Sequence, residues 1–194
     1  MGATTRGCPY EIVMDCFMKY NPDIHHRRSI RLKGYDYSRN GAYFITVCAQ
    51  NRTCFFGNIK QGEMILNDAG KMAQDIWIEI PEYYDGIEIN AFQIMPNHIH
   101  GIIIVGAGPR ACPDNDISQK GLSLPDVVHR FKTLTTKKYI DGVKQHDWQP
   151  FDRKLWQRNY HEHIIRDEQS LHKIREYIMN NPRDWERDEL FIQA

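Results

Sequence analysis

The sequence predicts an α+β fold of the ferredoxin-like, split βαβ type: an antiparallel sheet with helices on one face, plus an extra helix near the C-terminus. Three observations lead to this prediction. Short segments rich in β-branched and aromatic residues alternate with segments of helical periodicity in the order β-α-β-β-α-β. Turn dipeptides such as Asn40-Gly41 and Pro96-Asn97 separate these segments. An amphipathic segment that ends at Asn181-Pro182 follows the last strand.

The first half of the predicted domain is a strand followed by a helix. Residues 42–50 are rich in Tyr, Phe, Ile, Thr and Val, which is typical of a buried strand. Residues 54–66 contain two glycines and predict a hairpin or a pair of short strands. A helix is expected from a cap at Asn67 or Asp68 to about Ile80, where the next residue, a proline, ends it.

The second half begins with two strands, at residues 87–95 and 98–105, which a short turn makes antiparallel neighbours. The glycine- and proline-containing stretch 106–121 predicts a mobile loop. A helix is expected from about Ser123 to just before Asp141-Gly142.

A fourth strand is expected within residues 155–165, followed by the final helix. Asp167 is a suitable N-cap for this helix. Leu171, Ile174 and Ile178 recur at helical spacing and form its apolar stripe.

Composition excludes several classes of protein. The chain has 194 residues, with 25 Lys and Arg against 25 Asp and Glu, so its overall charge gives no sign of a polyanionic partner. It contains no apolar run of the roughly 18–20 residues that a membrane helix needs. No basic segment precedes an apolar one at the N-terminus, so we expect a cytoplasmic protein. The five cysteines form no CxxC pair, which argues against a disulfide framework or a cysteine zinc site.

Two stretches of the chain are locally basic. The cations that we single out are Arg27, Arg28, Arg31, Lys33, Arg130, Lys132, Lys137 and Lys138. Tyrosines and histidines are interleaved with the first group, as in segments that bind nucleic acid, but either stretch is equally compatible with a solvated face. We divide the chain into a basic extension at 1–40, a domain at 41–185 and a tail at 186–194.

The strongest candidate for chemistry is His98-Ile99-His100, at the start of the third core strand. Because side chains alternate along a strand, both imidazoles point to one face and can converge on one cation. Two histidines leave a metal site incomplete, so an oxygen ligand from another element is needed. The alternative is that the histidines are simply polar residues at a strand end.

Tyr177 and Asn181 are four residues apart on the final helix and therefore share one face. A phenol can act as a covalent nucleophile, and an amide oxygen can ligate a metal without adding charge. By itself Tyr177 also fits a half-buried packing role. A competing motif, the segment 161–163, is a second His-x-His, but its middle residue is the charged Glu162.

Five segments resemble, in this order, the single-tyrosine HUH transposases of the IS200/IS605 class: RRSIRLKGYDY, AYFITVCAQNR, INAFQIMPNHIHGIIIV, FKTLTTKKY and REYIMNNPRDW. They are most similar to the branch of REP-associated tyrosine transposases. The resemblance implies that His98, His100 and Asn181 bind Mg²⁺ or Mn²⁺. It also implies that Tyr177 attacks a phosphodiester of single-stranded DNA, which gives a 5′-phosphotyrosine link and a free 3′-OH. Asn181 is one methylene shorter than the Gln of many relatives.

The same resemblance implies a partner, a single-stranded DNA with hairpin structure, contacted by the basic segment 27–39 and by the helix around residues 131–139. Relatives act either as homodimers that exchange the tyrosine helix or as monomers. Three alternatives remain open: a nicking enzyme domesticated for host repeats, a DNA-hairpin-binding module without catalysis, and a small-molecule metallohydrolase. The last would have a deep closed pocket at the two histidines.

Overall fold

A four-stranded antiparallel sheet forms the centre of the computed structural model, which describes residues 34–106 and 123–192. Its strands are β1 (Gly41–Cys48), β4 (Ile87–Ile94), β5 (His98–Val105) and β6 (His161–Ile165), arranged in the order β4-β5-β1-β6. Each neighbouring pair is antiparallel. This arrangement confirms the predicted α+β, ferredoxin-like fold.

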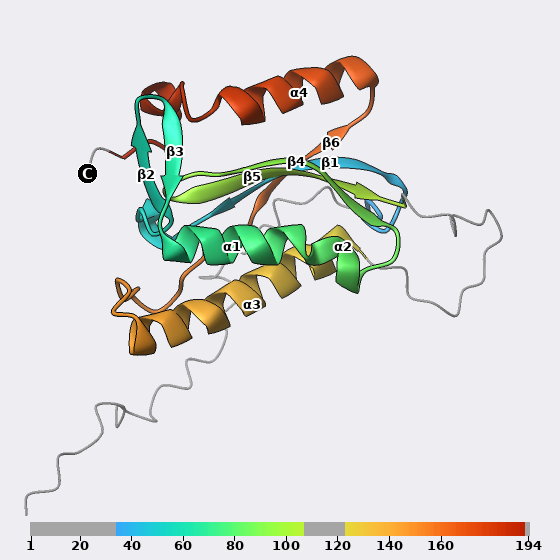
Figure 1. Ribbon diagram of the computed structural model, residues 1–194. Helices are drawn as coiled ribbons and strands as arrows, with labels where there is room; N and C mark the ends of the chain where they lie inside the picture. Colours follow the sequence, from blue (N-terminus) through green and yellow to red (C-terminus); the bar gives the residue numbers. More distant parts are fainter. Residues whose placement is uncertain (1–33, 107–122, 193–194) are drawn as a thin grey trace, which may run out of the picture.

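Helices cover both faces of the sheet. In Figure 1, α1 (Asp68–Ile78) and α3 (Leu124–Gln145) lie on one face, and α4 (Glu168–Asn180) lies on the other. Thus the two helices of the split βαβ unit share a face, as predicted, and the extra C-terminal helix occupies the opposite one. Within the described residues, none of the helices combines the length and the apolar character needed to cross a membrane.

Smaller elements complete the described chain. The predicted hairpin is present as β2 (Gly57–Lys60) and β3 (Glu63–Leu66), which pair only with each other. The short helix α2 (Ile80–Tyr83) follows α1, and the single turns η1 (Gln50–Arg52) and η2 (Trp185–Arg187) follow β1 and α4.

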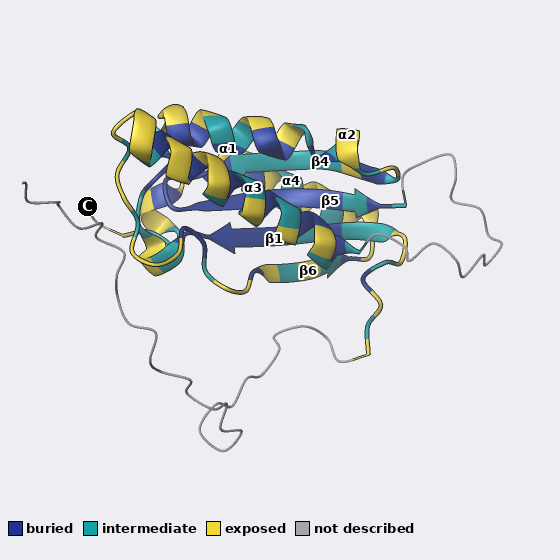
Figure 2. Cartoon of the chain, turned by 90° about the horizontal axis from the view of Figure 1, so that it is seen from below, coloured by how far each residue is buried: buried dark blue, intermediate teal, exposed yellow. Residues whose placement is uncertain are grey.

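Alternation along the central strands divides the apolar residues into two cores. The larger core lies between the sheet and the helices α1 and α3, where Ile45, Val47, Ile99 and Ile103 pack with Trp77. Figure 2 views the sheet from this side and shows β1 and β5 mostly buried beneath the helices.

The second core lies under α4 and is much smaller. Its buried members are Ile102, Ile165 and Ile178, with Leu171 and Ile174 packed against them. These contacts confirm the predicted apolar stripe of the last helix. Because so few residues attach α4, its position rests on a small apolar contact area.

Side-chain caps define the helix starts that the sequence predicted. The Asn67 side chain accepts a hydrogen bond from the Gly70 amide at 2.8 Å, and Asp167 accepts one from the Ser170 amide at 2.7 Å. Each bond satisfies a backbone donor that the first helical turn leaves unpaired.

Two predicted helix ends are wrong. Pro81 does not terminate α1, which already ends at Ile78, but lies in the first turn of α2, where proline needs no intrahelical donor. The α3 helix does not stop before Asp141-Gly142 and continues to Gln145. A Cβ on Gly142 would lie 2.3 Å from Cε3 of Trp148, so this glycine permits close packing inside the helix.

Other predictions fall outside the described residues. These are the basic residues Arg27, Arg28, Arg31 and Lys33 and nearly all of the loop expected at 106–121. The boundaries of the 1–40 extension and the 186–194 tail stay predictions.

Replacing Gly101 of β5 by alanine should destabilise the fold, because the added Cβ would lie 2.4 Å from Cζ2 of the buried Trp77. Overpacking of this kind costs about 1–3 kcal/mol of unfolding free energy, which urea denaturation can measure. Gly41→Ala in β1 is the matched control, since its nearest contacts are at 3.7 Å. Equal stability of the two variants would contradict the packing described here.

Candidate active site

The two histidines of β5 lie on the face of the sheet that α4 covers. His98 is opposite Cys48 of β1, and His100 is opposite Thr46, so the alternation turns both imidazoles away from the larger core. Their side chains are 0% and 2% exposed, and their ring centroids are 4.4 Å apart. The strand therefore delivers two adjacent, desolvated imidazoles to one point.

Each imidazole has a partner at Nδ1. His98 Nδ1 lies 2.8 Å from the Asn97 side-chain oxygen, and His100 Nδ1 lies 2.9 Å from the Thr46 hydroxyl. Within the described part of the chain, His98 Nε2 is buried without a hydrogen-bond partner. Burying an unpaired ring nitrogen costs free energy unless the nitrogen has a ligand, so this atom is suited to bind a cation.

Burial also keeps both rings uncharged. It lowers the pKa of His98 well below its usual value, with neighbouring His100 and Arg52 adding to the effect. Burial likewise lowers the pKa of His100 to about 4, although nearby Asp188 opposes the shift. Neutral imidazoles have the free lone pair that a metal ligand needs, and binding a metal at neutral pH then displaces no proton from them.

The α4 helix brings a phenol to the two histidines. Tyr177 is 47% exposed, and its hydroxyl lies 3.3 Å from His100 Nε2 and 3.4 Å from a carboxylate oxygen of Asp188. Its ring packs edge-on against Phe44 of β1. Burial and the adjacent carboxylate of Asp188 raise the pKa of this phenol to about 12. Tyr177 therefore keeps its proton at neutral pH unless positive charge is added beside it.

Asn181, the C-cap of α4, also faces the site. It is 2% exposed, and its side-chain nitrogen donates to Asp188 Oδ2 at 2.8 Å. Its side-chain oxygen is buried and has no hydrogen-bond partner among the described residues. The amide thus offers a free, desolvated oxygen near the imidazoles.

Asp188 is the site residue that the sequence did not reveal. One ligand atom each from His98, His100 and Asp188 lie within 4.8 Å of one another. The acidic run around Asp188 reads as a solvated face, and no periodicity connects it with β5 or α4. Its place depends on the fold of the segment after α4, which brings Asp188 against Tyr177 and Asn181.

These side chains fit a divalent cation. Two neutral imidazoles, a free amide oxygen and one carboxylate are the mixed nitrogen and oxygen donors that Mn²⁺ accepts, and the oxygen donors also suit Mg²⁺. The arrangement therefore gives a possible His-His-Asp metal site, with Asn181 as an additional oxygen donor.

Among the residues that the structure describes, the second His-x-His motif forms no comparable cluster. It lies on the edge strand β6, where His161 and His163 are both exposed. His161 is opposite Thr46 and so faces the same side as His100, whereas Glu162 faces the other side. His161 lines the pocket at the site without joining the group of metal-ligating atoms described above.

The basic residues of α3 are not brought to the site, because that helix covers the opposite face of the sheet (Figure 1). The Lys132 ammonium donates to the backbone carbonyls of Gln157 and Asn159 at 2.9 Å each. The Arg130 guanidinium stacks 4.1 Å from the centre of the Tyr83 ring. Lys137 and Lys138 are exposed on α3. Their role as DNA contacts stays a prediction.

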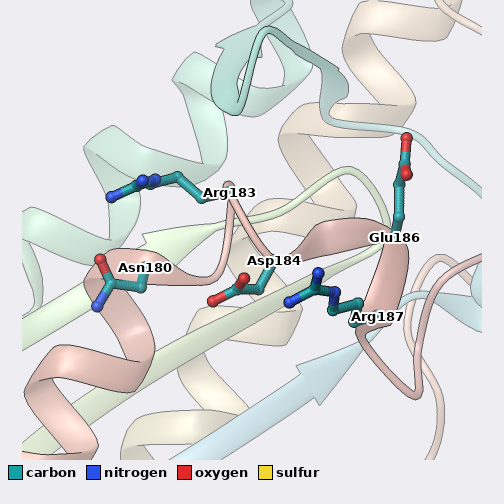
Figure 3. A pocket seen from close by; sticks show the side chains of 5 residues that line it. All are labelled: Asn180, Arg183, Asp184, Glu186 and Arg187. Atoms are coloured by element: carbon teal, nitrogen blue, oxygen red, sulfur yellow. The ribbon is translucent and has the colours of Figure 1, made fainter.

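Two pockets meet at the end of α4. The site pocket, of about 530 Å³, is lined by the phenol of Tyr177, His100 and Asn181, with Arg52 and Arg187 as its cations. Figure 3 shows its neighbour, of about 450 Å³, whose lining residues are Asn180, Arg183, Asp184, Glu186 and Arg187. Asp184 and Arg187 line both pockets, so the site continues along this end of the helix.

A His-hydrophobic-His strand at the centre of a ferredoxin-like sheet, met by a tyrosine helix on the same face, is the arrangement of HUH-like nucleic-acid enzymes. Comparison with known families agrees with this class. The model described as "Transposase IS200 like" matches residues 42–181. The chain therefore belongs to the IS200-like transposase family.

Individual relatives agree with this assignment. An uncharacterized protein of Haemophilus influenzae is 44% identical over 183 residues, which cover 90% of this chain and 98% of that protein. A second protein of this organism carries the provisional name REP-associated tyrosine transposase. It is 26% identical over 157 residues, covering 76% of this chain and 73% of that protein.

A solved structure supports the fold. It contains a REP-associated tyrosine transposase bound to a REP hairpin and superimposes with a TM-score of 0.51 at 22% identity. The match covers 79% of this chain and 73% of the other. The likeness to REP-associated transposases is thus a distant one.

The depressed histidine pKa values predict that the metal-free protein loses stability in mild acid. In the unfolded chain the pKa of each imidazole returns to about 6.5. Between this pKa and the lower pKa of the folded state, the unfolded state therefore binds more protons than the folded state. The stability is therefore present above about pH 6.5 and falls as the pH falls. His100 alone should lower the free energy of unfolding by about 2 kcal/mol between pH 7 and pH 5, which urea denaturation can measure.

His100→Gln should flatten this pH dependence, and His161→Gln, an exposed histidine on the same face, should leave it unchanged. Identical pH profiles for the wild type and His100→Gln would show that burial does not hold this imidazole neutral.

Proposed function

We propose that this chain is a metal-dependent enzyme that nicks single-stranded DNA and transfers the strand through a 5′-phosphotyrosine at Tyr177. One observation carries the proposal: within a single chain, the Tyr177 hydroxyl lies 3.3 Å from His100 Nε2, next to the unpaired Nε2 of His98. Membership of the IS200-like family supports it.

The chemistry requires few groups. The Tyr177 oxygen attacks the phosphorus of the scissile phosphodiester, a Tyr–O–P bond forms, and the bond to the 3′ oxygen breaks. Mg²⁺ or Mn²⁺, held by His98 and His100 with oxygens of Asn181 and Asp188, would supply charge stabilisation on the phosphate oxygens. The Tyr177 hydroxyl donates to the Asp188 carboxylate at 3.4 Å, and the proton that the phenol loses ends on the leaving 3′ oxygen, which becomes the free 3′-OH. Because the tyrosyl ester keeps a phosphodiester bond, a 3′-OH can reverse the step without ATP.

We propose a single-stranded DNA that contains a hairpin as the partner, as the REP hairpin bound by the structural relative suggests. Arg52 and Arg187 line the site pocket and are placed to contact phosphates beside the scissile bond. The basic segment 27–39 and α3 are proposed as further contacts. The site pocket and α3 lie on opposite faces of the sheet, so DNA that contacts both of them must pass around an edge of the sheet.

The alternatives make different predictions. A hairpin-binding module would bind the same DNA and form no covalent product. A small-molecule metallohydrolase would enclose its substrate, whereas Tyr177 is 47% exposed and the site opens to solvent. A nicking enzyme domesticated for host repeats would share the covalent step and differ only in its biological outcome.

Incubation with a hairpin oligonucleotide that carries a 5′ single-stranded flank, in the presence of Mn²⁺, should give a covalent protein–DNA adduct. Denaturing electrophoresis detects this adduct as a shifted band. Tyr177→Phe should abolish it, because the phenylalanine ring has no nucleophilic oxygen. EDTA should also abolish it.

Tyr83→Phe is the matched control, since Tyr83 is an exposed tyrosine of α2, on the opposite side of the sheet. It should form adduct at the wild-type level. Tight hairpin binding without adduct, for every metal tried, would instead support the binding module.

The position of Tyr177 beside His100 of its own chain predicts catalysis in cis. Mixing His100→Ala with Tyr177→Phe should restore no adduct, because neither chain contains both groups. If chains exchange α4, each mixed dimer would contain one active site that combines one chain's His100 with the other's Tyr177. Since half of statistically formed dimers are mixed and one of their two sites is intact, the mixture would regain up to about a quarter of the wild-type activity. Gel filtration of the same samples reports whether the chain is a monomer or a homodimer.

A further inference from the structure

Asn97, in the turn between β4 and β5, contacts three separate parts of the chain. It is 1% exposed. Its side-chain nitrogen donates to the backbone carbonyls of Arg52, at 3.0 Å, and of Leu190, at 2.9 Å. Its side-chain oxygen lies 2.8 Å from His98 Nδ1. All the polar atoms of this amide are therefore used.

The two carbonyls fix the orientation of the amide. A carbonyl oxygen only accepts hydrogen bonds, so the side of the Asn97 amide that faces Arg52 and Leu190 must be the NH₂ group. The Oδ1 atom must then face His98. With the amide turned over, its oxygen would face two other oxygens and its NH₂ would lack both acceptors.

The orientation of the amide determines the proton position on His98. Oδ1 only accepts, so His98 Nδ1 must carry the hydrogen and donate it. In a neutral imidazole the other nitrogen, Nε2, then has the free lone pair. That Nε2 is one of the two buried atoms at the candidate metal site, with Asn181 Oδ1, that have no hydrogen-bond partner among the described residues.

The same amide holds the C-terminal segment over the site. The Leu190 carbonyl accepts from Asn97, and the Leu190 amide donates to Asp188 Oδ1 at 2.6 Å. Asp188 Oδ2 in turn accepts from Asn181. A continuous chain of hydrogen bonds thus joins His98 to Asn181 through Asn97 and Asp188.

We propose that Asn97 is a positioning residue of the metal site: it sets the tautomer of His98 and ties the segment that carries Asp188 to the start of β5. The metal-binding part rests on the proposed function. Only an amide supplies both an acceptor for the imidazole and two donors for the carbonyls, which gives this buried position a chemical reason to be asparagine. Partners of this kind contribute about 10–100-fold to metal affinity.

The first test uses the metal-free wild-type protein at neutral pH. Long-range ¹H–¹⁵N NMR spectra distinguish a protonated from an unprotonated nitrogen in each imidazole, and His98→Gln assigns the signals. We expect His98 to carry its proton on Nδ1. A proton on Nε2 would overturn the proposal without any change at Asn97.

The second test separates the two roles. Asn97→Asp keeps the acceptor for His98 but loses both donors, whereas Asn97→Ala loses all three hydrogen bonds. We expect Asn97→Asp to keep the Nδ1–H tautomer, with faster hydrogen exchange of residues 188–190. In Asn97→Ala, the proton of His98 should no longer be restricted to Nδ1, and Mn²⁺ binding should weaken by roughly 10–100-fold. Electron paramagnetic resonance of free Mn²⁺ measures the binding.

Asn58→Ala, at an exposed position of β2, is the control and should leave all three measurements unchanged. If Asn97→Ala is folded by circular dichroism and retains both the tautomer and the Mn²⁺ affinity, the proposal fails. If it does not fold, Asn97→Asp and the wild-type spectrum still decide. None of these measurements uses DNA, so an absence of nicking activity would count against the proposed function and not against the role of Asn97.

Discussion

The period-two alternation of β5 is the constraint on which the site depends. This central strand is covered on both faces, so each of its side chains must suit one of two different environments. Ile99, Gly101 and Ile103 face the larger core, where Trp77 occupies the space above Gly101. His98 and His100 consequently face α4. A shift of one residue in register would bury the imidazoles among apolar side chains and turn the isoleucines toward the site.

Tyr177, the proposed nucleophile, is held less firmly than the two histidines. Two pairing strands fix β5 along its length, whereas α4 is anchored by a small core whose buried residues are Ile102, Ile165 and Ile178. Tyr177 precedes Ile178 in sequence, so the apolar contact that anchors the helix also sets the distance from the phenol to His100. The arrangement joins a rigid pair of histidines, the proposed metal ligands, to a helix that a modest apolar contact holds in place.

Burial and the carboxylate of Asp188 dominate the electrostatics of the site. Burial, together with the Asp188 charge, raises the Tyr177 pKa to about 12, and burial keeps both imidazoles neutral. A divalent ion beside the phenol would act in the opposite direction, because nearby positive charge favours the ionised form. Because burial keeps His98 and His100 neutral, they do not themselves lower the Tyr177 pKa, and a bound metal ion would supply the positive charge that does.

Local sequence patterns determined the elements and much of the site. Alternation and helical spacing predicted the order of the elements along the chain, the caps at Asn67 and Asp167 and the pairing of two imidazoles, because each depends on residues close together in the chain. The tertiary structure decided the rest. Whether Tyr177 reaches His100, that α3 lies behind the sheet, and that Asn97 and Asp188 join the site all depend on contacts between distant segments. Such contacts produce no periodic pattern in the sequence, because they depend on the turn before β5 and on the segment after α4.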